Sequence, residues 1–298
     1  MNDTTMSSYI TGKGAFQLSE EILWEKINSE IAGIVNGFRG VIGLYIEDLN
    51  TGRRIDINGD KILAAGSTIK IPVLMQLFKR DAEGELDLQE PVNIGPEDIV
   101  AGSGVLQHLE GKFQLSLYNL AILMINVSDN IATNLCIDHA SINETNQLME
   151  KLGCVDTVLQ RKMIDWDAAA SGKENLATAR DMVKWLKILH KGEFVSQEIS
   201  DQVISVLGKS KSSPIREAIP AEVPIAGKTG GLEGVRCEVA LVKQQRRPYI
   251  LGIMTAFGVD NNNSETITHL AEIIWDYLGM LDRFTHHGRG LPSQYLPQ

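Results

Sequence analysis

The stretch AAGSTIKIPVL, residues 64–74, places Ser67 and Lys70 three positions apart at the start of a predicted helix. Ser, Thr and Gly are favoured at helix starts, so an ordinary helix N-terminus is one interpretation. Lys70, however, lies inside an apolar run, where an unpaired ammonium is costly to bury. Positions i and i+3 share a helix face, so Lys70 would reach the Ser67 hydroxyl. Because a desolvated lysine loses its charge readily, the pair is also typical of a nucleophile with its base.

The composition is that of an ordinary globular protein. The 298 residues are 43% apolar and 22% charged, enough for one large domain or two closely packed lobes. A net charge of -10 argues against nucleic acid or an anionic membrane as a partner. Three scattered cysteines do not make a disulfide framework, and the six histidines show no ligand spacing. We therefore expect no metal and no cofactor.

The sequence shows no targeting or membrane segment. Its first residues lack a basic region followed by an apolar run, which is the pattern of a secretory signal. Its apolar stretches are too short to span a membrane. On the sequence as given, we predict a cytoplasmic protein without a membrane partner.

Hydrophobic periodicity predicts a helix and a hairpin, then a long helical middle, then strands and a closing helix. In chain order the predicted elements are a helix at 19–37, a hairpin at 40–58, the Ser67 helix, a turn-rich stretch at 83–105, helices at 115–126, 141–152, 178–191 and 196–207, strands at 236–244 and 249–258, and a helix at 264–280.

This order predicts an α/β fold of the α+β kind. Hairpin strands pair antiparallel, so one antiparallel sheet built from both ends of the chain and flanked by helices is the economical arrangement. Residues 18–62 and 208–280 would form this α/β lobe, and residues 63–207 an all-helical lobe beside it. Residues 1–17 and 281–298 are predicted tails. The Ser67 helix then lies at the junction of the lobes, where clefts usually form.

Two further short motifs lie where such a cleft could collect them. Ser128-Asp129-Asn130 follows an apolar helix, and Lys228-Thr229-Gly230 precedes a strand. Alone, the first is readily interpreted as a polar connection that caps the next helix, and the second as a turn at the start of a strand. Coincidence is a poor explanation for Ser-x-x-Lys, Ser-Asp-Asn and Lys-Thr-Gly occurring in this order on matching elements.

Together these motifs resemble those of the penicillin-binding protein and serine β-lactamase superfamily, and within it the class A β-lactamases. The resemblance covers roughly residues 18–280 in element order. It implies the β-lactamase/transpeptidase-like fold, in which an antiparallel sheet covered by helices lies beside an all-helical lobe. It also implies that Ser67 is the nucleophile and Lys70 a base that activates it.

The same resemblance implies roles for the other motif residues. Ser128 would relay a proton to the leaving nitrogen, because a hydroxyl both donates and accepts. Lys228 would hold positive potential in the cleft. Asn130 would hold the substrate's side-chain amide and Thr229 its carboxylate. The backbone N–H groups of Ser67 and Gly231 would form an oxyanion hole.

Arg236 lies eight residues after Lys228 on the strand that follows. It is either a surface arginine or a second clamp on an anionic substrate group.

One element of the class A pattern is missing. Those enzymes carry a glutamate on a loop after the helical lobe, in a Glu-Pro-x-x-Asn pattern, that activates the water for deacylation. Aligning residues 157–161 with the start of that loop puts Met163 at the glutamate position. Asp165 and Asp167 lie nearby, and Asp165 is our candidate substitute base. Loop solvation and helix capping are the alternative interpretation of both.

These residues predict a serine hydrolase that acts through an acyl-enzyme on an amide or ester bond, β-lactamase-like in mechanism. The expected partner is a small-molecule or peptide-like substrate bearing a carboxylate. Alternatives are a D-amino-acid peptidase or esterase on the same site, and a penicillin-binding receptor that is acylated without turnover.

Overall fold

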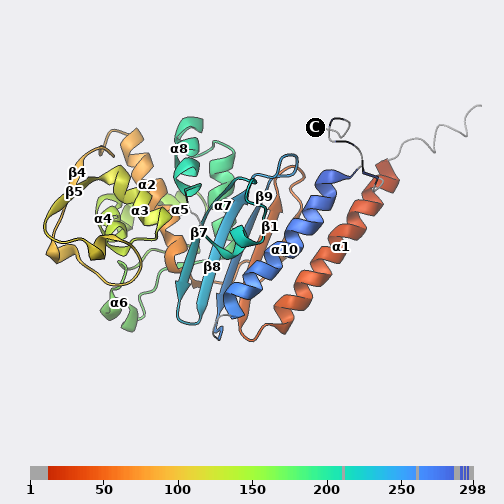
Figure 1. Ribbon diagram of the computed structural model, residues 1–298, viewed down its shortest axis with the longest axis horizontal. Coiled ribbons are helices and arrows are strands. Elements are labelled where there is room, and N and C mark those ends of the chain that lie inside the picture. The colour runs from red at the N-terminus through yellow and green to blue at the C-terminus, as the bar shows by residue number, and fades with distance from the viewer. Residues whose placement is uncertain are drawn as a thin grey trace, which may run out of the picture.

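The computed structural model describes residues 13–209, 212–259, 262–284, 289–290, 292 and 294. Its centre is a five-stranded antiparallel sheet with the strand order β2-β1-β9-β8-β7 (Figure 1). Strands from the two ends of the chain meet where β1 pairs with β9. The strands are β1 (Val41–Asp48), β2 (Arg54–Ile57), β7 (Ile225–Leu232), β8 (Val235–Val242) and β9 (Tyr249–Ala256). This architecture confirms the predicted fold class.

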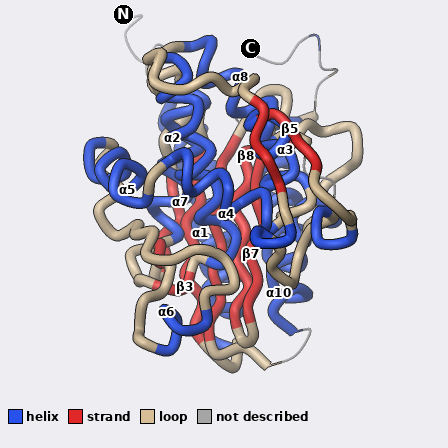
Figure 2. The backbone as a smooth tube through the Cα atoms, turned by 90° about the vertical axis from the view of Figure 1, so that its left-hand side faces the viewer, coloured by secondary structure: helices blue, strands red, loops and turns tan. Residues whose placement is uncertain are grey.

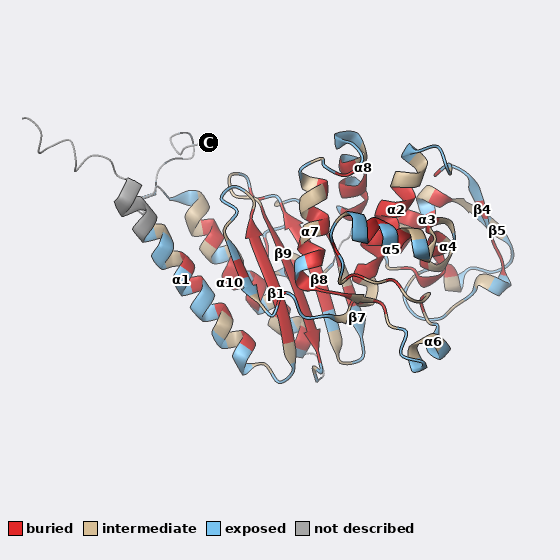
Figure 3. Ribbon diagram, turned by 180° about the vertical axis from the view of Figure 1, so that it is seen from behind, coloured by how far each residue is buried: buried red, intermediate tan, exposed pale blue. Residues whose placement is uncertain are grey.

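Both faces of the sheet are covered by helices. Strand β9 is buried at every position, which explains why its sequence is a continuous apolar run without alternation. Helices α1 (Lys13–Gly37) and α10 (Asn262–Arg283) pack side by side over one face, and α7 (Ala179–His190) packs on the other (Figure 3). Helix α7 lies within the segment 63–207 that we assigned to the helical lobe, yet it contacts β1, β8 and β9.

Four further helices gather around α2 (Lys70–Ala82) (Figure 2). The residues of α2 from Lys70 to Phe78 are all buried. Around it lie α3 (Leu117–Asn126), α4 (Asn130–Ala140), α5 (Ile142–Lys151) and α8 (Gln197–Leu207). Two short helices, α6 (Trp166–Ala170) and α9 (Pro214–Glu217), lie in loops. The beginning of α2 therefore sits where this bundle meets the sheet.

The structure corrects several predicted elements. Helix α4 was not predicted, because polar Asn130 and Thr133 are among its buried residues and obscure its apolar period. Lys228 and Thr229 lie inside strand β7, and not in the predicted turn. The prediction was wrong because three glycines in this strand lower its apparent strand propensity. A small hairpin, β4 (Pro91–Ile94) with β5 (Phe113–Ser116), extends from the turn-rich stretch and takes two residues from the helix predicted at 115–126.

The two terminal helices extend into the segments predicted as tails. Helix α1 begins at Lys13 and α10 ends at Arg283, beyond the predicted limits of 18 and 280. None of the helices in the described part of the chain is long and apolar enough to cross a membrane.

Candidate active site

Ser67 lies in a single 3-10 turn, Gly66–Ile69, immediately before α2. The helix-capping interpretation of this serine does not hold, because the N-cap positions of the turn and of α2 are Ala65 and Ile69. The Ser67 side chain is half-buried, and its hydroxyl makes no hydrogen bond within the described residues. A hydroxyl placed at the front of a buried helix and left without a structural partner is available for chemistry.

Lys70 is fully buried at the first position of α2. Its Nζ donates to the carbonyl oxygen of Ser128 at 2.7 Å, to Ser128 Oγ at 3.0 Å and to Asn130 Oδ1 at 3.2 Å. Burial, reinforced by the nearby charge of Lys228, lowers the pKa of Lys70 well below its ordinary value. The ammonium is therefore destabilised relative to the neutral amine.

The predicted hydrogen bond between Lys70 and the Ser67 hydroxyl is absent from the described residues, and the donor count gives the reason. An ammonium has three N–H donors, and here Ser128 and Asn130 accept all three. The neutral amine has only two donors and one lone pair. Loss of one proton therefore frees the lone pair that would accept a proton from serine.

Ser128 connects the two lysines of the site. Its Oγ accepts hydrogen bonds from Lys70 Nζ at 3.0 Å and from Lys228 Nζ at 3.2 Å. With both lone pairs engaged, the hydroxyl proton is left to point elsewhere, as a proton relay requires. Ser128 also has a φ of +56°, a conformation that non-glycine residues rarely adopt. This local strain is characteristic of functional positions.

Asp129 holds the Ser128 loop in place. Its buried carboxylate accepts the backbone N–H groups of Val105, Leu106 and Ala132 at 2.7 to 2.9 Å. The sequence indicated only a helix cap here. The structure shows that the same side chain also fixes the loop at residues 101–107 against the site.

We expect Asp129→Ala to lower the free energy of unfolding by about 3 kcal/mol, because it leaves three N–H groups without their acceptor. The exposed N-cap variant Asp165→Ala is the matched control, with a loss of about 1 kcal/mol. Urea unfolding measures both values. Equal losses would contradict the role of Asp129 as the anchor of this loop.

The two predicted oxyanion-hole amides lie at a close contact between the Ser67 turn and strand β7. A Cβ on Gly230 would come within 2.7 Å of the Ser67 nitrogen, and one on Gly66 within 3.0 Å of the Gly231 nitrogen. Gly66 also has a φ of +49°, which favours glycine. Only glycines let the two segments approach so closely, and this contact brings strand β7 at Gly230 and Gly231 against the Ser67 turn.

Arg236 lies beside this contact. It pairs with Gly231 across strands β7 and β8, and a Cβ on Gly231 would lie only 2.4 Å from Arg236 Nη1. The side chain is exposed, and its Nε donates to Ser264 Oγ on α10 at 3.1 Å. The half-buried Thr229 lies two residues before Gly231 on the same strand. Thr229, Gly231 and Arg236 thus lie together on strands β7 and β8, while Asn130 contacts Lys70 and the carbonyl of Ala101.

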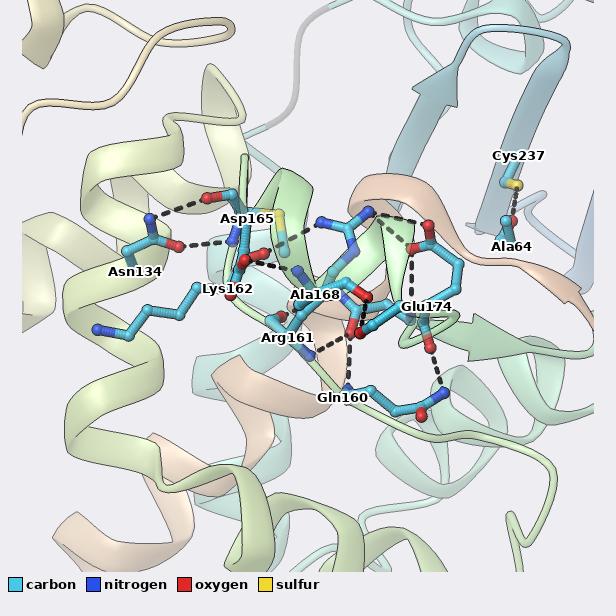
Figure 4. Close-up of polar contacts among 12 residues, drawn as sticks. Ala64, Asn134, Gln160, Arg161, Lys162, Asp165, Ala168, Glu174 and Cys237 are labelled. Atoms are coloured by element: carbon cyan, nitrogen blue, oxygen red, sulfur yellow. Dashed lines mark hydrogen bonds and ion pairs between the residues drawn. The ribbon is translucent and has the colours of Figure 1, made fainter.

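The loop at residues 158–176, which carries Met163 at the predicted glutamate position, is held by many polar contacts (Figure 4). Its two ends pair through Val158 and Leu176, and the N–H of Ala65, two residues before Ser67, donates to the carbonyl of Asn175 at 2.8 Å. Met163 is buried, with its backbone N–H and carbonyl both bonded to the side chain of Asn134 on α4. An apolar side chain therefore occupies a well-fixed position on the loop.

Asp165 and Asp167 are both exposed. The Asp165 carboxylate accepts the backbone N–H of Ala168 at 2.9 Å and forms the N-cap of α6 (Figure 4). Asp167 lies in the first turn of that helix. These positions are the ones expected if Asp165 and Asp167 serve to cap and solvate helix α6.

Sequence reasoning missed Asn134. It lies four residues after Asn130 on the same face of α4, a spacing that could have identified it as a neighbour of the site. Among the described residues, no group of three or more His, Cys, Asp or Glu side chains is arranged to hold a metal ion.

Comparisons with known proteins agree with this geometry. The model of the beta-lactamase enzyme family, Beta-lactamase2, matches residues 26–278. The chain is 24% identical to Beta-lactamase ROB-1 of Haemophilus influenzae over 233 residues, covering 76% of this chain and 75% of that protein. It is 27% identical to a beta-lactamase of Rhodobacter capsulatus over 176 residues, covering 58% and 60%.

Solved structures are similar over most of their length. PBP-A superposes with a TM-score of 0.79 at 26% identity, covering 85% of this chain and 96% of that one. The beta-lactamase from Sphaerobacter thermophilus superposes with a TM-score of 0.78 at 28% identity, covering 86% and 98%. The fold and the matched sequence define a β-lactamase-like hydrolase. The chain belongs to the beta-lactamase enzyme family, which confirms the predicted resemblance.

Proposed function

We propose that this hydrolase works through a covalent acyl-enzyme on Ser67, formed from a β-lactam, amide or ester. The single observation that supports this most strongly is the arrangement of Lys70, Ser128 and Lys228. A buried lysine of lowered pKa shares the Ser128 hydroxyl with a second buried lysine, Lys228, which is the first residue of the Lys-Thr-Gly motif on β7. Such an array can move a proton without histidine or metal.

The chemical steps follow from these contacts. Neutral Lys70 takes the Ser67 proton as Oγ attacks the substrate carbonyl. The amides of Ser67 and Gly231 stabilise the negative charge on the carbonyl oxygen. Ser128, bonded to both lysines, gives a proton to the leaving nitrogen or oxygen as the bond breaks. The proton that Lys70 took from Ser67 then passes to Ser128, which restores both groups, while the Lys228 ammonium holds positive charge beside them.

The substrate is proposed to carry a carboxylate. Thr229 and Arg236 lie at one end of the site, where a guanidinium and a hydroxyl would bind it. Asn130 at the other end would receive the substrate's amide. A small β-lactam or a peptide-like molecule fits both ends.

Slow deacylation is part of this proposal. Met163 has no basic group, and the Asp165 carboxylate caps α6. General-base assistance is worth roughly 10²–10⁴-fold, so the acyl-enzyme should persist with β-lactams. PBP-A, similar over 85% of this chain, has been solved as a leucine-to-glutamate variant in an acyl-enzyme complex with penicillin G. The lack of a basic group at Met163 favours the second candidate, a penicillin-binding protein or D-amino-acid peptidase whose natural acyl group leaves by another route.

Steady-state hydrolysis separates these candidates. Product formation is followed with a penicillin, a small activated ester and a peptide ending in D-amino acids, each with wild type and with Ser67→Ala. We expect Ser67-dependent turnover of the ester or the peptide to exceed that of the penicillin. Turnover that survives Ser67→Ala would overturn the proposed mechanism.

The pH dependence of acylation is a further prediction. The lowered pKa of Lys70 means that the neutral base, and hence the rate, increases as pH rises through that pKa. Burial lowers the pKa of Lys228 to about 8, opposed by Glu238, so its charge and its contribution are lost above that pH. Acylation measured from pH 5 to 10 should give a bell with an alkaline limb near 8. A rate still rising at pH 9 would contradict it.

A further inference from the structure

A carboxyl group lies buried behind the end of the site that is proposed to bind the substrate carboxylate. Glu238 on strand β8 is only 3% exposed. It pairs directly with Thr229 on β7, and Arg236 lies two residues before it on β8. Directly opposite residues, and residues two apart on a strand, present their side chains to the same face of a sheet. Thr229, Arg236 and Glu238 therefore share one face.

The structure keeps this carboxyl in place by specific contacts. Glu238 Oε2 accepts the backbone N–H of Ile215 at 3.1 Å, and the Ser213 hydroxyl also bonds to the carboxyl. The residue therefore fastens the segment around α9 to the strand next to Lys-Thr-Gly. The amide oxygen of a glutamine in its place could also accept the N–H of Ile215. This structural contact therefore does not require an ionisable carboxyl group.

The charged groups around Glu238 are few. Lys228 on β7 and Arg236 on its own strand are positive, and Glu217 on α9 is negative. Its pairing partner on β9 is apolar Ile253. On α10, which covers this face, Glu265 and Glu272 are exposed to solvent. Of the charges coupled to Glu238, Lys228 belongs to the proposed site, so a negative charge on Glu238 would change the potential there.

We propose that Glu238 is a specificity-determining residue, whose protonation state sets how strongly the Thr229 and Arg236 end of the site binds an anionic substrate. This rests on the proposed function, in which that end receives the substrate carboxylate. When Glu238 is neutral, the substrate carboxylate meets only Arg236 and Lys228. When it is ionised, the two carboxylates repel each other, and anionic substrates lose their advantage over neutral ones.

The direction with pH follows from burial. Burial raises the pKa of Glu238 to about 7, opposed by the bonds from Ser213 and Ile215. The group is neutral below that pH and charged above it. Binding of a carboxylate-bearing substrate should therefore weaken as pH rises through 7, while binding of a neutral analogue should not. For one added charge near a partly solvated cleft, the full effect is about tenfold.

The test compares penicillin G with its neutral methyl ester on the full chain. Intact mass spectrometry gives the second-order acylation rate constant for each probe, and the ratio of the two cancels the titration of Lys70. For a tenfold full effect, the ratio should fall about threefold between pH 6 and 7.5 in wild type. In Glu238→Gln the fall centred on pH 7 should be lost, leaving only the smaller decline from loss of charge on Lys228, whose pKa Glu238 otherwise raises. The exposed variant Glu233→Gln, on the turn between β7 and β8, should keep the wild-type fall.

The outcomes are distinguishable. If neither probe acylates Ser67, the proposed function fails. If both acylate but the ratio is flat in wild type, or falls equally in Glu238→Gln, this inference fails alone. Should Glu238→Gln not fold, Ser213→Ala provides the second test. It removes a bond that lowers the pKa of Glu238, so the midpoint of the fall should move to higher pH. An unmoved midpoint would overturn the inference.

Discussion

Replacing Lys70 with methionine is expected to slow acylation by penicillin by roughly 10²–10⁴-fold, the usual worth of a general base. Lys70 is fully buried among apolar residues of α2, so methionine fits its volume and removes only the amine. Loss of the amine leaves the Ser67 hydroxyl protonated at neutral pH and breaks the bond to Ser128. The rate constant is measured by quenching the reaction at set times and recording the intact mass of the protein.

The control for this variant is Lys79→Met, which changes a lysine on the same helix that pairs with Glu83 at the protein surface. It should acylate at the wild-type rate. A Lys70→Met protein that folds and still acylates within about threefold of wild type would remove Lys70 from the mechanism, since a base is worth far more than this.

Met163→Glu is expected to shorten the lifetime of the penicillin acyl-enzyme by roughly 10²–10⁴-fold. The backbone at this position is held from both sides by Asn134, so a new carboxylate would start from a fixed place on the loop. The loop in turn is bonded to Ala65, two residues before the nucleophile. Burial of the site would raise the pKa of the new carboxyl towards neutrality, which suits a general base.

Met163→Gln is the matched control, since it has the same size and polarity without a basic group. Release of the acyl group is followed by the decay of the adduct mass after excess penicillin is removed. An equal lifetime in the Glu and Gln variants would show that position 163 does not govern deacylation.

Much of the fold was predictable because the N-terminal and C-terminal segments of the chain show the apolar patterns and turn residues of ordinary strands and helices. The hairpin of β1 and β2 follows from two strand-like runs around Asn50–Gly52, and the apolar run of β9 identifies a central strand. Strand β7 and helix α4 were not predictable in the same way. Their glycines and buried polar residues serve the site, and they override the periodic patterns on which such predictions depend.

The same contrast holds for the candidate site. The motifs identified Ser67, Lys70, Ser128 and Lys228, because spacing on adjacent elements is visible in a sequence. The contacts of Asp129 with distant amides, and of Asn134 with Met163, depend on loops that meet only after folding. The position of Glu238 opposite Thr229 depends on strand register, which sequence alone did not supply.

The central claim is a covalent acyl-enzyme on Ser67, and intact mass over time after mixing with penicillin G tests it most directly. We expect wild type to gain the mass of one penicillin, with the adduct on the peptide containing Ser67, and Ser67→Ala to gain none. An adduct of the same mass on Ser67→Ala, or one located on another residue of the wild-type chain, would contradict the account.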